Sequence, residues 1–437
     1  MAITDATVTP HTTRRYFPQL EGIRGLAALG VLVTHVAFSS RQIRWTEVPG
    51  FEQRGHGVYA YFLQQIEVCL PIFFALSGML LYRPYARATI AGTRGPKLKP
   101  YLWRRALRTL PAYWVLVIVT LFTLNPGNVH SVWRLVRPFL LLQIYDANAW
   151  PTSQGLEQTW SLGTEIAFYA TLPIFAALLN RYARRVDDPV RRARRILWCL
   201  GGAILVGFAF TVYDHRPSMG IWPVQNDWPI GWIGFIAVGM GIATLAAASE
   251  VTTRTVFPPF RWMARKPGLS WVAALVVLVL CMVSPFGDPA AANYPPMSEA
   301  IVEHWLYLLF GLFIVAPLAL PEGSSRFITG TLTNRVVLFL GRISYGVYLW
   351  HIAIIYWWNG SMFGAPSFLE LLFVTLAGSI VLATLSYLVV EHPAMKLRER
   401  LGKASVTPSV ETVDEPVPVA EPAQSVPAAK APDPVLG

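Results

Sequence analysis

The chain has 437 residues, of which 54% are hydrophobic and only 14% are charged, and its mean hydropathy is +0.43. Because soluble globular proteins carry about 25% charged residues, this composition excludes an ordinary soluble fold. The formal net charge is +11, but the basic residues lie in short runs between apolar stretches, which is typical of membrane topology and argues against a nucleic-acid partner. The sequence therefore predicts an all-α, multi-pass integral membrane protein.

A helix that crosses about 30 Å of hydrocarbon needs roughly 20 apolar residues, and ten stretches come close to this length. In chain order they are residues 20–38, 58–82, 106–124, 160–180, 196–213, 231–249, 268–284, 301–320, 336–356 and 368–390. Residues 1–15 contain no apolar core of a signal peptide, so we expect a flexible cytoplasmic N-terminus and a first span that inserts as an ordinary helix.

The apolar stretch 135–144 is too short to cross, and we expect it to be re-entrant or to lie at the membrane surface. With ten spans and the N-terminus inside, the inner segments hold 27 Lys and Arg and the outer loops hold 6. An eleventh span at 135–144 would place the arginine run 181–195 outside, against the rule that cytoplasmic loops are positive. Both termini are therefore expected in the cytoplasm, most simply of a bacterial-type plasma membrane.

The C-terminal segment 404–437 is rich in Pro, Ala, Val and Glu without periodicity. Such a composition cannot bury enough apolar surface to fold, so we expect a disordered cytoplasmic tail after a membrane domain at 16–403. The cysteines, Cys69, Cys199 and Cys281, lie in apolar stretches without a paired spacing or a nearby Cys/His cluster. Neither disulfides nor a metal site is expected.

Ionisable residues inside a span are energetically expensive and are candidates for function. Arg24 and His35 lie eleven residues apart on the first span, so both project from one helix face, about 16 Å apart along the axis. A neutral histidine within the membrane could accept a proton from a hydroxyl group. The alternative role for His35 is a hydrogen bond that holds two helices together.

Two further polar residues lie on later spans. Glu165, in WSLGTEIAFY, shares a helix stripe with Ser161 and Tyr169, and it could orient an imidazole or a sugar hydroxyl, or anchor the helix at the interface. His351, in GRISYGVYLWH, is in phase with Ser344, and a packing or hydrogen-bonding role is favoured over catalysis there.

The predicted cytoplasmic rim contains a cluster of arginines. Arg104, Arg105 and Arg108 precede the third span, and Arg342 begins the ninth. Guanidinium groups bind phosphate oxygens well, so the cluster could hold a phosphorylated donor. The alternative is that these residues only set topology and bind anionic lipid headgroups.

Several of these segments, in this order, resemble the integral-membrane acyltransferase 3 family. They are YFPQLEGIRGLAALGVLVTH, PIFFALSGMLLYRPYA, RRALRTLPAYW, WSLGTEIAFY and GRISYGVYLWH, followed by EHP at 391–393. The chain departs from the family where Leu70 and Pro71 replace a Gly-Val-Asp-like start, and where GTEIAFY has one acid instead of two. With no GDS-type nucleophile motif, the chain is similar to the stand-alone form without an esterase-like domain.

The resemblance implies an O-acyltransferase that moves an acyl group, often acetyl, from cytoplasmic acyl-CoA to a hydroxyl of a carbohydrate or lipid-linked acceptor in the cell envelope. It implies that His35 is the catalytic histidine and Arg24 its partner, with Glu165 in an acidic motif. It further implies that Arg104, Arg105 and Arg108, together with the Ser77-Gly78 element, lie in the donor region. Acyl-CoA would be a substrate, and no tightly bound cofactor is expected.

On this reading His35 deprotonates the acceptor as it attacks the thioester, with Arg24 and Arg342 on the rim below. Direct transfer is preferred, and an acyl-imidazole intermediate is the alternative. A different class of function is a proton-coupled transporter that uses His35 and Glu165 as relays. Against transport, matching halves of the chain contain no paired short or Gly/Pro-broken spans.

Overall fold

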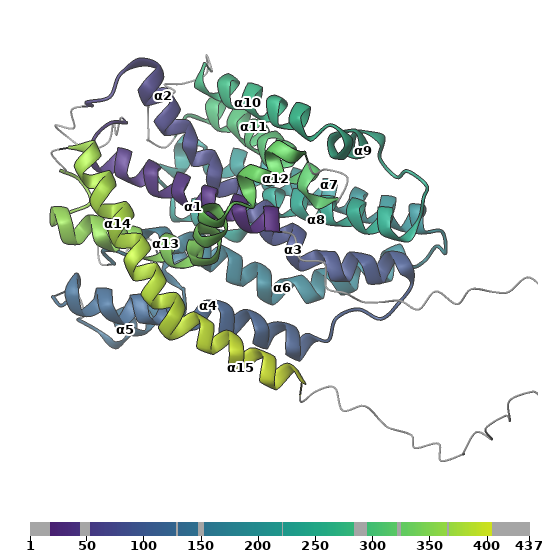
Figure 1. Ribbon diagram of the computed structural model, residues 1–437, viewed down its shortest axis with the longest axis horizontal. Coiled ribbons are helices and arrows are strands. Elements are labelled where there is room, and N and C mark those ends of the chain that lie inside the picture. Colours follow the sequence, from purple (N-terminus) through teal and green to yellow (C-terminus); the bar gives the residue numbers. More distant parts are fainter. Residues whose placement is uncertain are drawn as a thin grey trace, which may run out of the picture.

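The computed structural model describes residues 18–43, 53–127, 130–146, 153–220, 222–283, 295–320, 325–364 and 367–403. Every regular element in these ranges is helical (Figure 1), which confirms the predicted all-α class. The segments 1–15 and 404–437, for which flexibility and disorder were predicted, lie outside the described residues.

The long helices form an elongated bundle (Figure 1). They are α1 (Pro18–Ser39), α3 (Cys69–Ala91), α4 (Leu98–Thr123), α6 (Trp160–Ala183), α7 (Pro189–Asp214), α8 (Pro229–Val251), α10 (Pro267–Met282), α11 (Met297–Val315), α13 (Arg335–Asn359) and α14 (Phe368–Ser386). The shorter helices are α2 (Gly57–Gln65), α5 (Val132–Phe139), α9 (Pro258–Arg265), α12 (Arg326–Leu332) and α15 (His392–Lys403), and the π-helical turn η9 (Tyr387–Glu391) joins α14 to α15.

Nine helical stretches among the described residues are long and apolar enough to cross a membrane. A tenth crossing results if α9 and α10, which meet at a bend of 102°, are counted as one broken span. This pair covers the predicted span at 268–284. The prediction of about ten spans therefore agrees with the structure.

Two helices begin earlier than hydropathy predicts. The span predicted at 106 starts at Leu98 in α4, and the span predicted at 196 starts at Pro189 in α7. Both additional segments are rich in arginine. Hydropathy detects the part of a helix that matches the hydrocarbon, whereas the helix itself can continue into water. Arg104, Arg105 and Arg108 therefore lie within α4, and helical geometry fixes their directions.

Helix α5 covers the first half of the apolar stretch at 135–144 and does not cross the bundle. Its eight residues would span only about 12 Å. The Trp114 indole of α4 donates to the carbonyl of Phe139 (3.1 Å), and Arg137 is buried in an ion pair with Asp146. The opposite face exposes apolar side chains such as Val132 and Trp133. The segment thus lies against the bundle, as predicted.

Close glycine contacts position the helices that carry the candidate residues. A Cβ on Gly78 of α3 would lie 2.2 Å from the Ile236 carbonyl oxygen of α8, and a Cβ on Gly25 of α1 would lie 2.7 Å from the Gly341 nitrogen of α13. Small residues allow such close approach between membrane helices. Ser77, Arg24 and Arg342 each directly neighbour one of these contact glycines, so their directions are set by tight packing.

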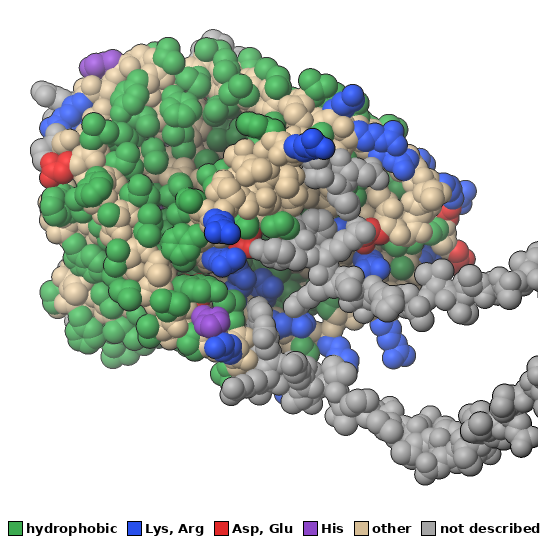
Figure 2. Space-filling model, viewed as in Figure 1, with side chains coloured by type: hydrophobic (Ala, Val, Ile, Leu, Met, Phe, Trp, Pro, Cys, Tyr) green, Lys and Arg blue, Asp and Glu red, His purple; other side chains and the backbone are tan. Residues whose placement is uncertain are grey.

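The surface separates apolar from charged regions. In Figure 2, hydrophobic side chains cover most of the left part of this face, whereas Lys and Arg gather at the centre and the right end. Large apolar residues such as Phe122 (79% exposed) and Trp198 (81% exposed) point outward. This is the distribution expected for a bundle with a lipid-facing belt and one strongly basic end.

Candidate active site

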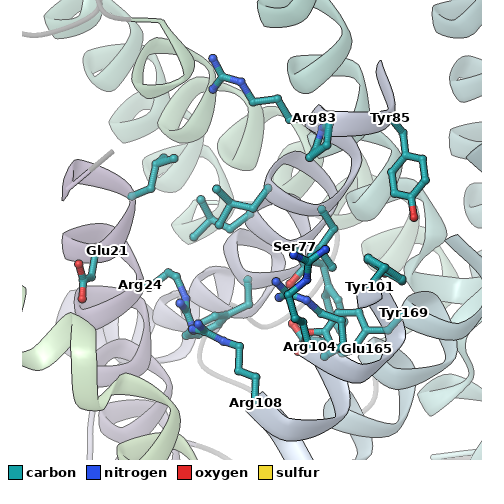
Figure 3. Close-up of a pocket in the computed structure, with 18 of the residues that line it drawn as sticks. Glu21, Arg24, Ser77, Arg83, Tyr85, Tyr101, Arg104, Arg108, Glu165 and Tyr169 are labelled. Carbon is teal, nitrogen blue, oxygen red and sulfur yellow. Dashed lines mark hydrogen bonds between the residues drawn. The ribbon is translucent and has the colours of Figure 1, made fainter. Parts of the chain in front are cut away.

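A cavity of about 1670 Å³ opens among the helices at the basic end of the bundle. Its walls come from α1, α3, α4, α6 and α13, with further residues from η9 and α15 (Figure 3). It is large enough for a substantial ligand, since binding pockets for small molecules are typically about 300–1,000 Å³. The polar lining residues that matter here are Glu21, Arg24, Ser77, Arg83, Arg87, Arg94, Arg104, Arg105, Arg108, Ser161, Glu165, Tyr169, Glu250, Arg342, Ser344, Tyr345, Tyr348, Tyr387 and Glu391.

The cavity wall has an excess of positive charge. Eight arginines and four glutamates line it, a formal excess of four positive charges. At one edge, Arg83 donates to Glu250 (2.5 Å), and Arg87 lies 3.8 Å from the same carboxylate. At another edge, Arg342 lies 3.9 Å from Glu21, and its side chain is 58% exposed. These two glutamates partly neutralise the edges, so the excess charge lies deeper.

The deeper charge comes from α1 and α4. Figure 3 shows Arg24 of α1 and Arg108 of α4 reaching toward the same part of the cavity, with Arg104 beside them. These three guanidinium groups form no ion pair or hydrogen bond with any described residue. Arg24 interacts electrostatically with Arg108 and Arg105, which repel it, and with Glu165, which attracts it. Converging guanidinium groups of this kind can bind an anion with several oxygens.

Glu165 lies at the centre of a hydrogen-bond network on the cavity wall. Ser77 of α3 donates to one carboxylate oxygen (2.7 Å), and Tyr169 of α6 donates to the other (2.7 Å). The structure therefore brings together Ser77 and Glu165, which are 88 residues apart in the chain. Glu165 faces the arginines and is not bonded to an imidazole. Its arrangement suits ordering the cavity wall rather than orienting His35.

The inner end of the cavity is lined by Ser161 and Tyr348. Their hydroxyl groups are 2.6 Å apart, and Ser161 lies one turn before Glu165 on α6, as its helix stripe predicts. The ring of Tyr348 packs against Phe73 of α3 on one side and against His351 on the other, with centroid distances of 6.1 and 5.8 Å. Tyr348 therefore separates the cavity from the histidine behind it.

His35 and His351 form a pair beyond Tyr348. Their ring centroids are 4.9 Å apart, and Nδ1 of His35 lies 3.3 Å from Nε2 of His351 and 2.9 Å from the Val31 carbonyl oxygen. His351 is fully buried, whereas His35 is only partly buried. Neither residue lines the cavity. His35 shares α1 with Arg24, as predicted, and reaches a zone one side chain beyond the cavity end.

Two donor-site predictions have different outcomes in the geometry. Arg104, Arg105, Arg108, Arg342 and Ser77 all line the cavity. Gly78 does not, because it faces α8 across the close contact described above. In this pair, Ser77 points toward the cavity, whereas Gly78 packs α3 against α8.

Sequence reasoning missed several lining residues. Glu391 lies in the π-helical turn η9 and is buried on the arginine side, where it faces Arg108 and Arg24. Tyr345 donates to the backbone carbonyl of Thr109 (2.8 Å) and ties α13 to α4. The available signals were the EHP segment at 391–393 and the tyrosines of GRISYGVYLWH, which follow Arg342 on one helix.

No group of His, Cys, Asp and Glu in the described ranges is arranged to hold a metal ion.

The geometry is thus a polar cavity inside a helical bundle, with arginines at one end and a histidine pair beyond the other. A family model described as "Acyltransferase domain" matches residues 17–389. The chain therefore belongs to this acyltransferase family, which confirms the resemblance found in the sequence.

The chain is similar to bacterial proteins along most of its length. A Staphylococcus aureus (strain COL) protein named for O-acetyltransferase activity is 23% identical over 89% of this chain, and this chain spans 59% of that relative. The acyltransferase MdmB of Streptomyces mycarofaciens is 24% identical over 91% of this chain and 97% of its own length. Nodulation protein 10 of Rhizobium leguminosarum bv. viciae is 22% identical over 76% and 82% of the two chains. No solved structure matches.

Proposed function

We propose that the protein is an O-acyltransferase of a bacterial plasma membrane that moves an acyl group, with acetyl as the first choice, from cytoplasmic acyl-CoA to a hydroxyl group. The acceptor would be a carbohydrate, glycolipid or related molecule of the cell envelope. The observation that carries the proposal is the cavity in which Arg24, on the same helix α1 as His35, converges with the arginines of α4. The names of the relatives, two of which denote acyltransferases or O-acetyltransferases, support this class of reaction.

The donor would enter from the basic end of the bundle. CoA carries a diphosphate and a 3′-phosphate, and guanidinium groups bind phosphate oxygens through paired, charge-assisted hydrogen bonds. Arg24, Arg104 and Arg108 are suited to this role because they point into the cavity without a protein partner among the described residues. The basic end would then face the cytoplasm, in agreement with the distribution of Lys and Arg in the loops.

The acyl group would reach the histidine pair along α1. Arg24 and His35 are separated by about 16 Å along the helix axis, so a pantetheine arm held at the arginines has to extend past Tyr348. The Tyr348 ring contacts the His351 ring at the inner end of the cavity, and a rotation of this side chain would open the route. His35 would then remove the proton of the acceptor hydroxyl while that oxygen attacks the thioester carbonyl.

Glu165 would act on the donor side and not as a partner of His35. Its two oxygens accept from Ser77 and Tyr169, which fixes a negative charge next to Arg24 and the α4 arginines. That charge would keep the guanidinium groups oriented before CoA arrives. The amide groups of the pantetheine arm could also hydrogen-bond to this polar wall.

The test is the replacement of His35 by Ala and by Gln in membrane vesicles supplied with radiolabelled acetyl-CoA. We expect transfer of label to the glycan and lipid fraction to fall by about 10²-fold or more, because general bases contribute 10²–10⁴-fold. Replacing Cys199, which lies on the exposed surface, by Ser is the matched control and should leave the rate unchanged. Wild-type transfer by correctly inserted His35→Ala would refute the base assignment. Proton-driven substrate movement without acyl-CoA would instead indicate a transporter.

A further inference from the structure

The contact between His35 and the Val31 carbonyl oxygen determines which ring nitrogen of His35 is available as a base. A backbone carbonyl can only accept a hydrogen bond, so the Nδ1 that lies 2.9 Å from the Val31 oxygen carries the proton. In the neutral ring, the lone pair is then on Nε2. This atom makes no hydrogen bond to any described residue, and the side chain is only partly buried. It is therefore free to accept a proton from a substrate.

This tautomer of His35 also assigns a role to the ring of His351. Because Nδ1 of His35 carries hydrogen, the Nε2 of His351 that lies 3.3 Å away is the acceptor. The proton of His351 is then on its Nδ1, a buried atom that forms no hydrogen bond with any described residue. The Nδ1–H of His35 is thus shared between a carbonyl oxygen of its own helix and a fully buried imidazole on α13.

Within the described ranges, no charged side chain near the pair could replace this acceptor. The titratable group against the pair is Tyr348 on α13, whose ring lies 5.8 Å from that of His351. Cys69 on α3 packs on Gly30 of α1, more than one turn before His35. Among the described residues, no carboxylate and no guanidinium interacts with either imidazole. A carboxylate that orients and supports a catalytic histidine, as in hydrolase triads, is therefore absent from this part of the structure.

We propose that His351 is a positioning residue that holds His35 in the tautomer with Nε2 free and supports the imidazolium formed during transfer. The proposal rests on the proposed function. As the acceptor oxygen bonds to the thioester carbon, its proton moves to Nε2 of His35. The carbon–sulfur bond then breaks, and the imidazolium returns this proton to the departing CoA thiolate. His351 accepts the Nδ1–H bond throughout and gains no proton.

The experiment compares three replacements of His351 in membrane vesicles with radiolabelled acetyl-CoA, with rates normalised to folded protein. His351→Gln keeps an acceptor of similar reach, whereas His351→Phe fills the space without one, and His351→Ala removes both. We expect His351→Gln to retain at least about a tenth of the wild-type rate, and His351→Phe and His351→Ala to lose about 10²-fold. The Michaelis constant for acetyl-CoA should change less than about threefold, because the donor arginines lie elsewhere.

The pH dependence separates positioning from packing. Without its acceptor, the imidazolium of His35 is less favoured, so the acidic limb of the pH–rate profile should move to lower pH in His351→Phe and stay near the wild-type position in His351→Gln. A His351→Phe variant that keeps its rate and profile overturns the proposal. So does a rate loss that follows only the amount of folded protein, with an unchanged profile, in all three variants. If His35→Ala is also active, the proposed function itself fails; if His35→Ala is inactive and His351→Phe is active, only the role of His351 fails.

Discussion

The carboxylate of Glu165 is held by two hydroxyl groups from different helices, and this arrangement has a consequence for nearby guanidinium groups. The two hydrogen bonds fix the position of this carboxylate, and Arg24 lies within its electrostatic reach. Arginines that would otherwise repel one another can then share a small volume. This part of the cavity therefore keeps its positive excess but also contains a carboxylate held in one position.

Replacing Arg108 by Gln should weaken donor binding more than it slows turnover. The guanidinium lines the cavity without an ion pair to any described residue, so its loss removes a phosphate contact and breaks no direct ion pair. We expect the Michaelis constant for acetyl-CoA to rise about tenfold, which corresponds to about 1.4 kcal/mol, with turnover reduced less. Arg195→Gln, at a half-buried position against the Tyr182 ring and outside the cavity, is the control. A larger effect on turnover than on the Michaelis constant would mean that the phosphates bind elsewhere.

Replacing Glu165 by Gln should reduce activity more than replacing Ser77 by Ala. The glutamine loses the charge that faces Arg24, whereas Ser77→Ala removes one of two hydrogen bonds to a carboxylate that Tyr169 still holds. A hydrogen bond to a charged group contributes about 1.5–3 kcal/mol. Thermal unfolding and acetyl transfer should be measured together. Equal activity losses in the two variants would show that the charge itself is unimportant.

The helix face on which a residue lies was easier to predict than the distant residue that it contacts. The spacing on α6 correctly placed Ser161, Glu165 and Tyr169 on one face, because a helix determines the neighbours four positions away. The bond between Ser77 and Glu165 joins positions 88 residues apart, and no local period encodes such a contact. His351 was expected to pack or to form a hydrogen bond, but its partner His35 lies 316 residues away.

At the scale of helices, the close contacts show which glycines are essential. Gly78 and Gly239 lie on opposite sides of the α3–α8 contact, and a Cβ on either one would approach a backbone carbonyl oxygen to 2.2 Å or 1.9 Å. Backbone atoms cannot move aside as a flexible side chain can. The two helices therefore approach each other closely only while both positions lack a side chain.

Gly78→Ala should destabilise the bundle, whereas Gly202→Ala should not. The first change forces α3 and α8 apart, and overpacking of this kind costs about 1–3 kcal/mol or more. Position 202 on α7 has open space at its Cβ, and alanine favours a helix over glycine by about 1 kcal/mol. Midpoints of thermal unfolding in detergent would measure both effects. A stable, fully active Gly78→Ala protein would contradict the packing described here.

The sequence predicted which segments are helical better than it predicted where each helix begins and ends. Leu98 begins α4 with residues such as Lys99, Arg104 and Arg105, which a hydropathy window rejects although they continue the same helix. The 102° bend between α9 and α10 was likewise not predicted. Apolar composition reports burial in lipid, whereas polar helix ends and bends depend on contacts made only in the folded chain.

For the whole molecule, the basic end and the apolar belt indicate how the bundle is oriented in the membrane. The loop from α3 to α4 and the start of α7 lie together, since Arg184 donates to the Ala88 carbonyl oxygen (3.1 Å) and Arg192 to that of Ile90 (3.2 Å). The turn after α7 lies at the other end of that 26-residue helix. Donor and acceptor could therefore approach from opposite sides.

Cysteine labelling tests this direction. Thr93→Cys at the cavity mouth and Ser218→Cys beyond α7 are both at exposed positions, and Cys199 would be replaced by Ser in each. A membrane-impermeant maleimide should label Ser218→Cys in intact cells and Thr93→Cys in inside-out vesicles. CoA should slow labelling of Thr93→Cys alone. Rapid labelling of Thr93→Cys in intact cells would reverse the orientation.

The π-helical turn at Tyr387–Glu391 makes the length of this segment critical. One extra residue per turn offsets the faces of α14 and α15 by roughly the 100° that each α-helical residue advances. Glu391 turns inward as a result, while Leu388 and Val389 remain on the outside. Substitutions at those two outward positions should be tolerated, but a single-residue deletion would swing the glutamate away from Arg108 and rotate the entire C-terminal helix. Natural variation here should therefore appear as exchanges of side chains and not as gaps.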